Sequence, residues 1–139
     1  MKDARPALRA LLLSSPAVTA ICGQRIFPAQ LPQGERRPSV VMNRTAGVFN
    51  YQMQGSGLLQ QNLYQLDSIA ETPDQADALA SAVYDVLTGF RGDVAYGSNS
   101  PQSFVTFQGI FASNIRDLYD SVTQLNRLAR DFLVWFTEA

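Results

Sequence analysis

The sequence contains no histidine, one cysteine and one lysine among its 139 residues. Without histidine, the chain cannot form a Ser-His-Asp or Cys-His catalytic centre, a histidine general base or most zinc and iron sites. The single cysteine, Cys22, excludes an intrachain disulfide, which suits a reducing compartment. Because Cys22 ends the apolar run Ala20-Ile21-Cys22, we expect it to be a buried hydrophobic residue rather than a nucleophile.

The chain also lacks an excess of charge of either sign. Its formal net charge is -1, so there is no global basic field for nucleic acid and no polybasic patch for a membrane. Every basic residue except Lys2 is arginine. Arginine forms bidentate ion pairs and is frequent at protein interfaces, but codon usage explains such a bias equally well.

Long hydrophobic runs are missing as well. The longest one near the start, Ala10–Leu13, is too short to span a bilayer, and no signal-peptide cleavage pattern accompanies it. We therefore expect a protein made in the cytoplasm, with no membrane partner. A content of 46% hydrophobic and 17% charged residues is typical of a globular chain, and the length predicts one domain over residues 1–139.

Two helices are expected at the start of the chain. Asp3 is a suitable N-cap, apolar residues follow at helical spacing, and Pro6 is tolerated in the first turn. The segment Ser14-Ser15-Pro16 ends this helix and begins a short second one, which Gly23 ends. A brief extended piece at 25–28, a loop at 28–38 and a strand at 39–45 follow.

The middle of the chain combines a glycine-bearing segment with a long strand. Phe49, Tyr51 and Met53 alternate between Gly47 and Gly57, which fits a loop folded onto its own core, a β-arm, or a hairpin tip that exposes aromatic rings to a partner. A strand is predicted over 58–70, with apolar residues on both faces. We expect that strand to be covered twice, once by a helix and once by a neighbouring subunit.

A helix beginning at Pro73 has the best local signal. Thr72 is expected to cap it, with Asp74 in the first turn and Gln75 completing a capping box, and Gly89 is the expected stop. Its many alanines predict a close approach to the sheet. The buried face is expected to consist of Ala76, Leu79, Ala80, Val83 and Leu87.

The last third predicts two more strands. After a loop at 91–103, residues 104–111 alternate as a strand, with a bulge at Gly109. Residues 116–120 read as a turn stabilised by Asp117 and Asp120, and a closing strand covers 125–137. The predicted fold is α+β, with a four-stranded, mainly antiparallel sheet and two main helices packed on one face.

Searches for chemical motifs fail. There is no phosphate-binding loop, no Cys-x-x-Cys pair and no metal-ligand cluster, so we expect no cofactor, no metal and no catalytic residue. Asp131 is the one polar residue out of keeping with the apolar closing strand, and it can pair with Arg116, Arg127 or Arg130, or with an arginine of another subunit.

Six short segments, in order and with their spacing, resemble the tail terminator or tail completion proteins of long-tailed phages and gene transfer agents. The N-terminal ones are Ala7-Leu8-Arg9-Ala10-Leu11-Leu12 with Ser15-Pro16-Ala17-Val18, Gly23-Gln24-Arg25-Ile26-Phe27-Pro28, and Leu31-Pro32-Gln33-Gly34 leading to Pro38-Ser39-Val40-Val41. The C-terminal ones are Leu87-Thr88-Gly89-Phe90-Arg91-Gly92, Arg116-Asp117-Leu118-Tyr119 and Asp131-Phe132-Leu133-Val134-Trp135-Phe136.

This resemblance implies a structural virion protein rather than an enzyme. Members of that family form a ring, usually of six subunits, on the last ring of the tail tube. They stop tube growth and present a surface to the head-tail connector or stopper protein, while DNA passes through the channel without specific binding. The implied partners are other copies of the chain, the tail tube protein and the connector, in the tail-neck region of a virion assembled in the host cytoplasm.

Composition and expected exposure suggest which residues contact these partners. The interface candidates are Glu35, Arg36, Arg37, Phe49, Tyr51, Met53, Arg116 and Tyr119. Two alternatives remain open. One is another neck component, such as a head completion or connector protein. The other is a small α+β enzyme or ligand-binding domain with a cleft lined by Tyr64, Tyr119 and Trp135.

Overall fold

A computed structural model describes residues 4–28, 38–48, 51–52, 55–56, 59–97, 103–120 and 125–138. The helices are α1 (Arg5–Leu13), α2 (Pro16–Cys22) and α3 (Pro73–Leu87). The strands are β1 (Ile26–Pro28), β2 (Ser39–Val48), β3 (Tyr51–Gln52), β4 (Gly55–Ser56), β5 (Leu59–Ala70), β6 (Gly92–Tyr96), β7 (Ser103–Asp120) and β8 (Leu125–Glu138).

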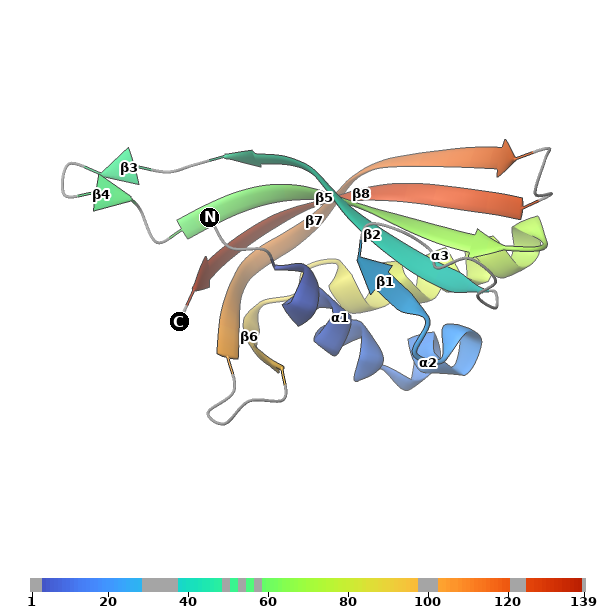
Figure 1. Cartoon of the computed structure of the whole chain (residues 1–139), viewed down its shortest axis with the longest axis horizontal. Helices are drawn as coiled ribbons and strands as arrows, with labels where there is room; N and C mark the ends of the chain where they lie inside the picture. Colours follow the sequence, from blue (N-terminus) through green and yellow to red (C-terminus); the bar gives the residue numbers. More distant parts are fainter. Residues whose placement is uncertain are drawn as a thin grey trace.

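The main sheet has six strands in the order β1-β2-β5-β8-β7-β6. All neighbours are antiparallel except β1 and β2, which run parallel. The predicted antiparallel character is confirmed, but the prediction of four strands is wrong. The two extra strands are the short β1 and β6, which cover only part of the margins of four long strands (Figure 1). Strands β3 and β4 form a separate two-stranded ribbon.

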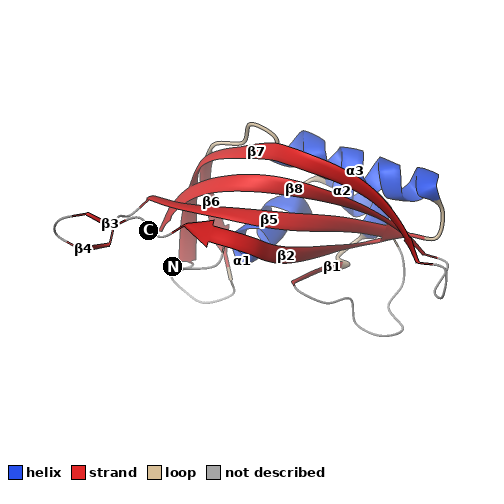
Figure 2. Cartoon of the chain, turned by 90° about the horizontal axis from the view of Figure 1, so that it is seen from above, coloured by secondary structure: helices blue, strands red, loops and turns tan. Residues whose placement is uncertain are grey.

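All three helices lie on one face of this sheet (Figures 1 and 2), and each was predicted from the sequence, α2 as the short one beside the two main helices. Their apolar residues and one face of the strands form a single core. Cys22 is buried in that core, as expected. The alanines of α3 make a second, smaller cluster, in which Ala76 and Ala80 pack with Ala70 and Leu128. The predicted close approach of this helix to the sheet is therefore confirmed. None of the described helices is long and apolar enough to cross a membrane.

The start of α3 forms as its sequence predicts. Pro73 occupies the first turn, and the Thr72 hydroxyl oxygen accepts a hydrogen bond of 3.2 Å from the Gln75 backbone N–H. That bond satisfies one of the N–H groups that have no partner within the helix. At the other end, Gly89 has a φ of 75°, a left-handed conformation that glycine adopts without a steric cost.

Strand β7 is the main departure from the sequence prediction. The expected turn at 116–120 and the expected strand end at Phe111 are both wrong, because β7 runs unbroken to Asp120. Two register shifts interrupt its pairing with β8: one between Phe107 and Gly109, as predicted, and one between Ala112 and Asn114. The loop predicted over 91–103 is also wrong in part, since it contains β6.

A buried polar contact joins β5 to the start of α1. The Tyr64 hydroxyl oxygen accepts hydrogen bonds from the Ala4 backbone N–H (2.9 Å) and from Asn62 Nδ2 (2.8 Å). All three residues are fully buried, so neither donor has water as a substitute. This contact fixes where the first helix begins on the sheet.

We expect Tyr64→Phe to lower the free energy of unfolding by about 2 kcal/mol, because two buried donors lose their acceptor. Urea unfolding followed by circular dichroism measures this change. Tyr84→Phe, which removes a hydroxyl from a partly exposed tyrosine, is the matched control and should change stability by less than about 0.5 kcal/mol. Equal losses in the two variants would contradict the role given to Tyr64.

Candidate functional site

The face of the sheet opposite the helices has a polar centre formed by β5, β8 and β7. Asp67 on β5 is fully buried there. Its carboxylate accepts a 2.9 Å hydrogen bond from Gln65 Nε2 and lies 3.2 Å from Arg127 Nη1 on β8. Because a buried carboxylate needs hydrogen bonds and a countercharge, these two contacts keep Asp67 in place.

The same cluster continues to the outermost long strand. Arg116 on β7 donates a 2.9 Å hydrogen bond from Nη2 to Gln65 Oε1, and the same nitrogen lies 3.5 Å from Asp131 Oδ1. The predicted pairing of Asp131 with an arginine is thus confirmed, with Arg116 as its partner. We call Gln65, Asp67, Arg116, Arg127 and Asp131 the polar cluster. It links three neighbouring strands through side chains alone.

Burial raises the pKa of the Asp67 carboxyl above its ordinary value of 3.8. The hydrogen bond from Gln65 and the positive charges of Arg127 and Arg116 act in the opposite direction, and the negative charge of Asp131 adds to the rise. Both guanidinium groups are about half exposed, so water weakens their effect on the buried carboxylate. Desolvation is therefore the largest influence on this group.

Next to the polar cluster, the same face becomes apolar. Phe111, Leu133 and Leu63 stand directly opposite one another on β7, β8 and β5, and residues directly opposite share a face. Phe111 is 53% exposed, and its ring lies so close to Gly109 that an added Cβ would be 2.9 Å from it. Phe104 (45% exposed) and Leu59 (37% exposed) are further exposed apolar residues of β7 and β5. We call Leu59, Leu63, Phe104, Phe111, Leu133 and Trp135 the apolar patch.

Most of the predicted interface residues cannot be placed on this face. Glu35, Arg36, Arg37, Phe49 and Met53 lie outside the described residues. The backbone of Tyr51 pairs with Ser56 in the β3–β4 ribbon, and that of Tyr119 pairs with Asn126 between β7 and β8. Arg116 is the only candidate whose side-chain contacts are described, and it belongs to the polar cluster.

The cleft proposed for a small enzyme or ligand-binding domain is not formed. Tyr64 faces the helices and is fully buried, whereas Trp135 lies on the opposite face of the sheet. Among the described residues, no group of three histidine, cysteine, aspartate or glutamate side chains could hold a metal ion. Half-exposed arginines beside exposed aromatic rings are instead typical of a surface that contacts another protein.

Sequence reasoning missed Asp67 and Gln65, and it named Arg127 only as one of the arginines that can pair with Asp131. All three lie on strands that were predicted from their apolar residues alone. They meet only because the register of β5 against β8 brings them together. The one available signal was the spacing of Gln65 and Asp67, which puts both on the same face of a strand.

Comparison with known proteins identifies the class. A family model of phage tail proteins matches residues 6–137, nearly the whole chain, so this is a virion protein of the tail. The family is described as Tail completion protein gp17, and the chain belongs to it. The resemblance found in the sequence is thereby confirmed.

Solved structures share this fold. Among them is a chain from the virion of a native gene transfer agent (GTA) particle, with a TM-score of 0.68 and 16% sequence identity. The match covers 95% of this chain and 92% of the other. No curated protein sequence matches.

The raised pKa of Asp67 predicts a pH effect on stability. The folded state binds a proton at this carboxyl at a higher pH than the unfolded state does. We compare the unfolding free energy of the wild type with that of Asp67→Asn at each pH. The difference should rise in favour of the wild type as pH falls from about 7 through the pKa of Asp67 in the folded state, and it should level off near the pKa of Asp67 in the unfolded state. Urea unfolding at several pH values checks this.

Asp85→Asn, which removes an exposed carboxylate from α3, is the control for the loss of one negative charge. A relative stability that instead decreases toward low pH would show that the arginines outweigh desolvation at Asp67.

Proposed function

We propose that this protein is the tail terminator, which caps the tail tube as a ring of six copies, stops tube polymerisation and provides the surface for head-tail joining. Membership of the tail completion family carries this proposal. Within the family, the apolar patch supports a role that needs contact with other protein subunits. Monomeric proteins rarely leave several large apolar side chains exposed together, because each such contact with water is unfavourable.

The proposed ring requires a head-to-tail interface, in which two different surfaces of each subunit meet. The partners are then other copies of this chain, the last ring of the tail tube protein and the head-tail connector or stopper protein. DNA passes through the channel without specific binding, and the net charge of -1 agrees with a lumen that does not hold the phosphate backbone. The protein acts through contacts only and has no enzymatic activity.

Removing the protein tests the proposal directly. Particles assembled without it should have tails that exceed the normal length and fail to join heads, because nothing ends tube growth. Electron micrographs measure both properties, and supplying the wild-type chain should restore them. Tails of normal length that still join heads would refute the terminator role, and a label located elsewhere in the neck would identify a different neck component.

Phe111→Ser should separate assembly from folding. Because Phe111 is already 53% exposed in the free subunit, the free energy of unfolding should fall by less than about 1 kcal/mol. Incorporation of the variant into particles should nevertheless decrease. Phe90→Ser is the contrasting variant, because Phe90 packs edge-on against the core residue Phe107 with ring centroids 5.9 Å apart. It should lower the melting temperature. If Phe111→Ser is incorporated as well as the wild type, the apolar patch is not part of the interface.

A further inference from the structure

Strands β2 and β7 form opposite margins of the four long strands, and each is only partly covered (Figure 2). On β2, the short β1 pairs with Val40–Met42. On β7, β6 pairs with residues 103–107. Among the described residues, the margin of β2 from Asn43 to Val48 and that of β7 from Gln108 to Asp120 have no strand beside them.

The free part of β7 has a defined beginning. The backbone N–H of Gly89, just after α3, donates a 2.9 Å hydrogen bond to the Ile110 carbonyl, so the margin is already occupied there. From Phe111 to Asp117 every residue is exposed. An unpaired strand margin of this length presents backbone donors and acceptors to any extended chain, which is the basis of strand addition.

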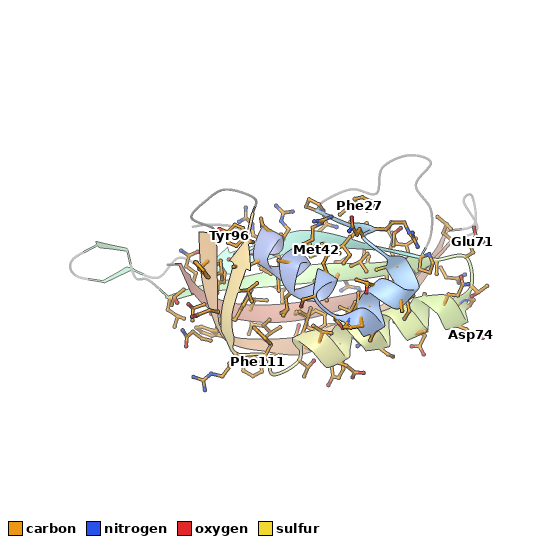
Figure 3. The ribbon with its side chains drawn as sticks, turned by 90° about the horizontal axis from the view of Figure 1, so that it is seen from below. Phe27, Met42, Glu71, Asp74, Tyr96 and Phe111 are labelled. Carbon is orange, nitrogen blue, oxygen red and sulfur yellow. The ribbon has the colours of Figure 1, made fainter. Side chains whose placement is uncertain are left out.

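Two depressions lie beside this margin, between β7 and α3, and together we call them the groove. Near the C-terminal half of α3, a depression of about 470 Å³ is lined by Tyr84, Ile115 and Arg130, among others. The Arg130 guanidinium lies over the Tyr84 ring, 4.8 Å from its centroid. Near the N-terminal half, a second depression of about 470 Å³ is lined by Asp74, Asp77 and Asp117. Figure 3 shows this helix-bearing side, with Asp74 and Phe111 labelled.

The second depression is acidic. Arg127 also lines it, but its guanidinium is engaged with Asp67 in the polar cluster. The carboxylates of Asp74, Asp77 and Asp117 therefore favour an occupant that carries a positive charge.

We propose that the free margin of β2 from a second copy of this chain adds to the free margin of β7, so that the sheet continues from one subunit to the next. This inference rests on the proposed ring and specifies its interface. In the order β2-β5-β8-β7, the directions alternate, so β2 of the next copy runs antiparallel to β7. The two margins differ, which makes the contact head-to-tail and able to close a ring.

Both margins restrict how the strands align. The added β2 is limited at one end by Gly89 on Ile110 and at the other by its own β1, which pairs with Val40–Met42 just before Asn43. Six residues of β2 must then lie along the ten residues from Phe111 to Asp120. In an antiparallel pair, this puts Arg44 within about two residues of Asp117.

Arg44 has the chemistry that the groove requires. It pairs with Tyr64 across β2 and β5, so it lies on the helix-bearing face, as Asp117 does through its pairing with Leu128. It is exposed and makes no ion pair with another described residue. In the continued sheet, its guanidinium enters the groove lined by Asp74, Asp77 and Asp117.

Charge reversal in assembled particles tests this contact. Arg44→Glu and Asp117→Arg should each reduce the incorporation of the protein into particles by about tenfold, and combining them should restore most of it. Asp85→Arg, at an exposed position on α3 that lines neither depression, is the matched control. Melting temperatures of the free variants verify that each one folds. Normal incorporation of both single reversals would overturn the interface.

Cross-linking provides a measurement that does not depend on incorporation levels. The chain has one native cysteine, which is buried. In particles that contain Arg44→Cys/Asp117→Cys, a short bis-maleimide should give dimers and higher multiples of the chain on a denaturing gel, whereas each single variant gives none. A cross-link to another virion protein, or none to itself, would overturn the second copy as occupant.

The results distinguish this inference from the proposed function. If tails still end at normal length but neither the cross-link nor the charge rescue occurs, the terminator role stands and this interface is wrong. If tails keep their length and join heads when the protein is absent, the proposed function is the part that fails.

Discussion

The register of β5 against β8 is the constraint on which the rest of the structure depends. The two strands pair without interruption from Leu59 opposite Thr137 to Ala70 opposite Asn126. Because directly opposite residues share a face, this register sends Tyr64 and Phe132 toward the helices and Gln65 and Asp131 away from them. A shift of one residue would exchange the two sets, exposing the core and burying carboxylates.

On the face without helices, the same register builds a rigid platform. Asp67 has a buried carboxylate whose desolvation is offset only in part by Gln65 and Arg127, and Arg116 extends the contacts to β7. Removing one partner of such a group is costly, so the three strands are held in one arrangement by side chains as well as by backbone. The exposed rings of the apolar patch stand on this platform, which suits a surface that meets a partner without rearranging.

The free margin of β7 must avoid unspecific pairing with other chains. An uncovered strand margin invites unspecific pairing, and β7 has features that oppose it. Two bulges interrupt its regular spacing, and the Asn114 side-chain oxygen accepts a 2.9 Å hydrogen bond from the Ile115 N–H, which occupies one backbone donor. These features protect the free subunit from unspecific strand pairing. A partner that supplies both a matching strand and a positive charge can still bind at this margin, which would make the contact specific for assembly.

The sequence by itself determined the elements whose signals are local. Thr72 with Pro73 began α3, Ser15 with Pro16 began α2, and Gly109 marked a bulge, because each depends only on backbone geometry within a few residues. The absence of histidine excluded catalytic centres that depend on that residue, and the order of short segments identified the family.

The tertiary structure decided the features that depend on distant pairing. Residues 116–120 look like a turn because their polar side chains are exposed, but pairing with β8 makes them a strand. Strand β6 forms because β7 provides a template, not because its own five residues predict one. The contacts of the polar cluster between strands join residues 15 to 60 positions apart, and only the register of the sheet brings these side chains within hydrogen-bonding distance. The depression beside β7 likewise combines residues of α3, β7 and β8.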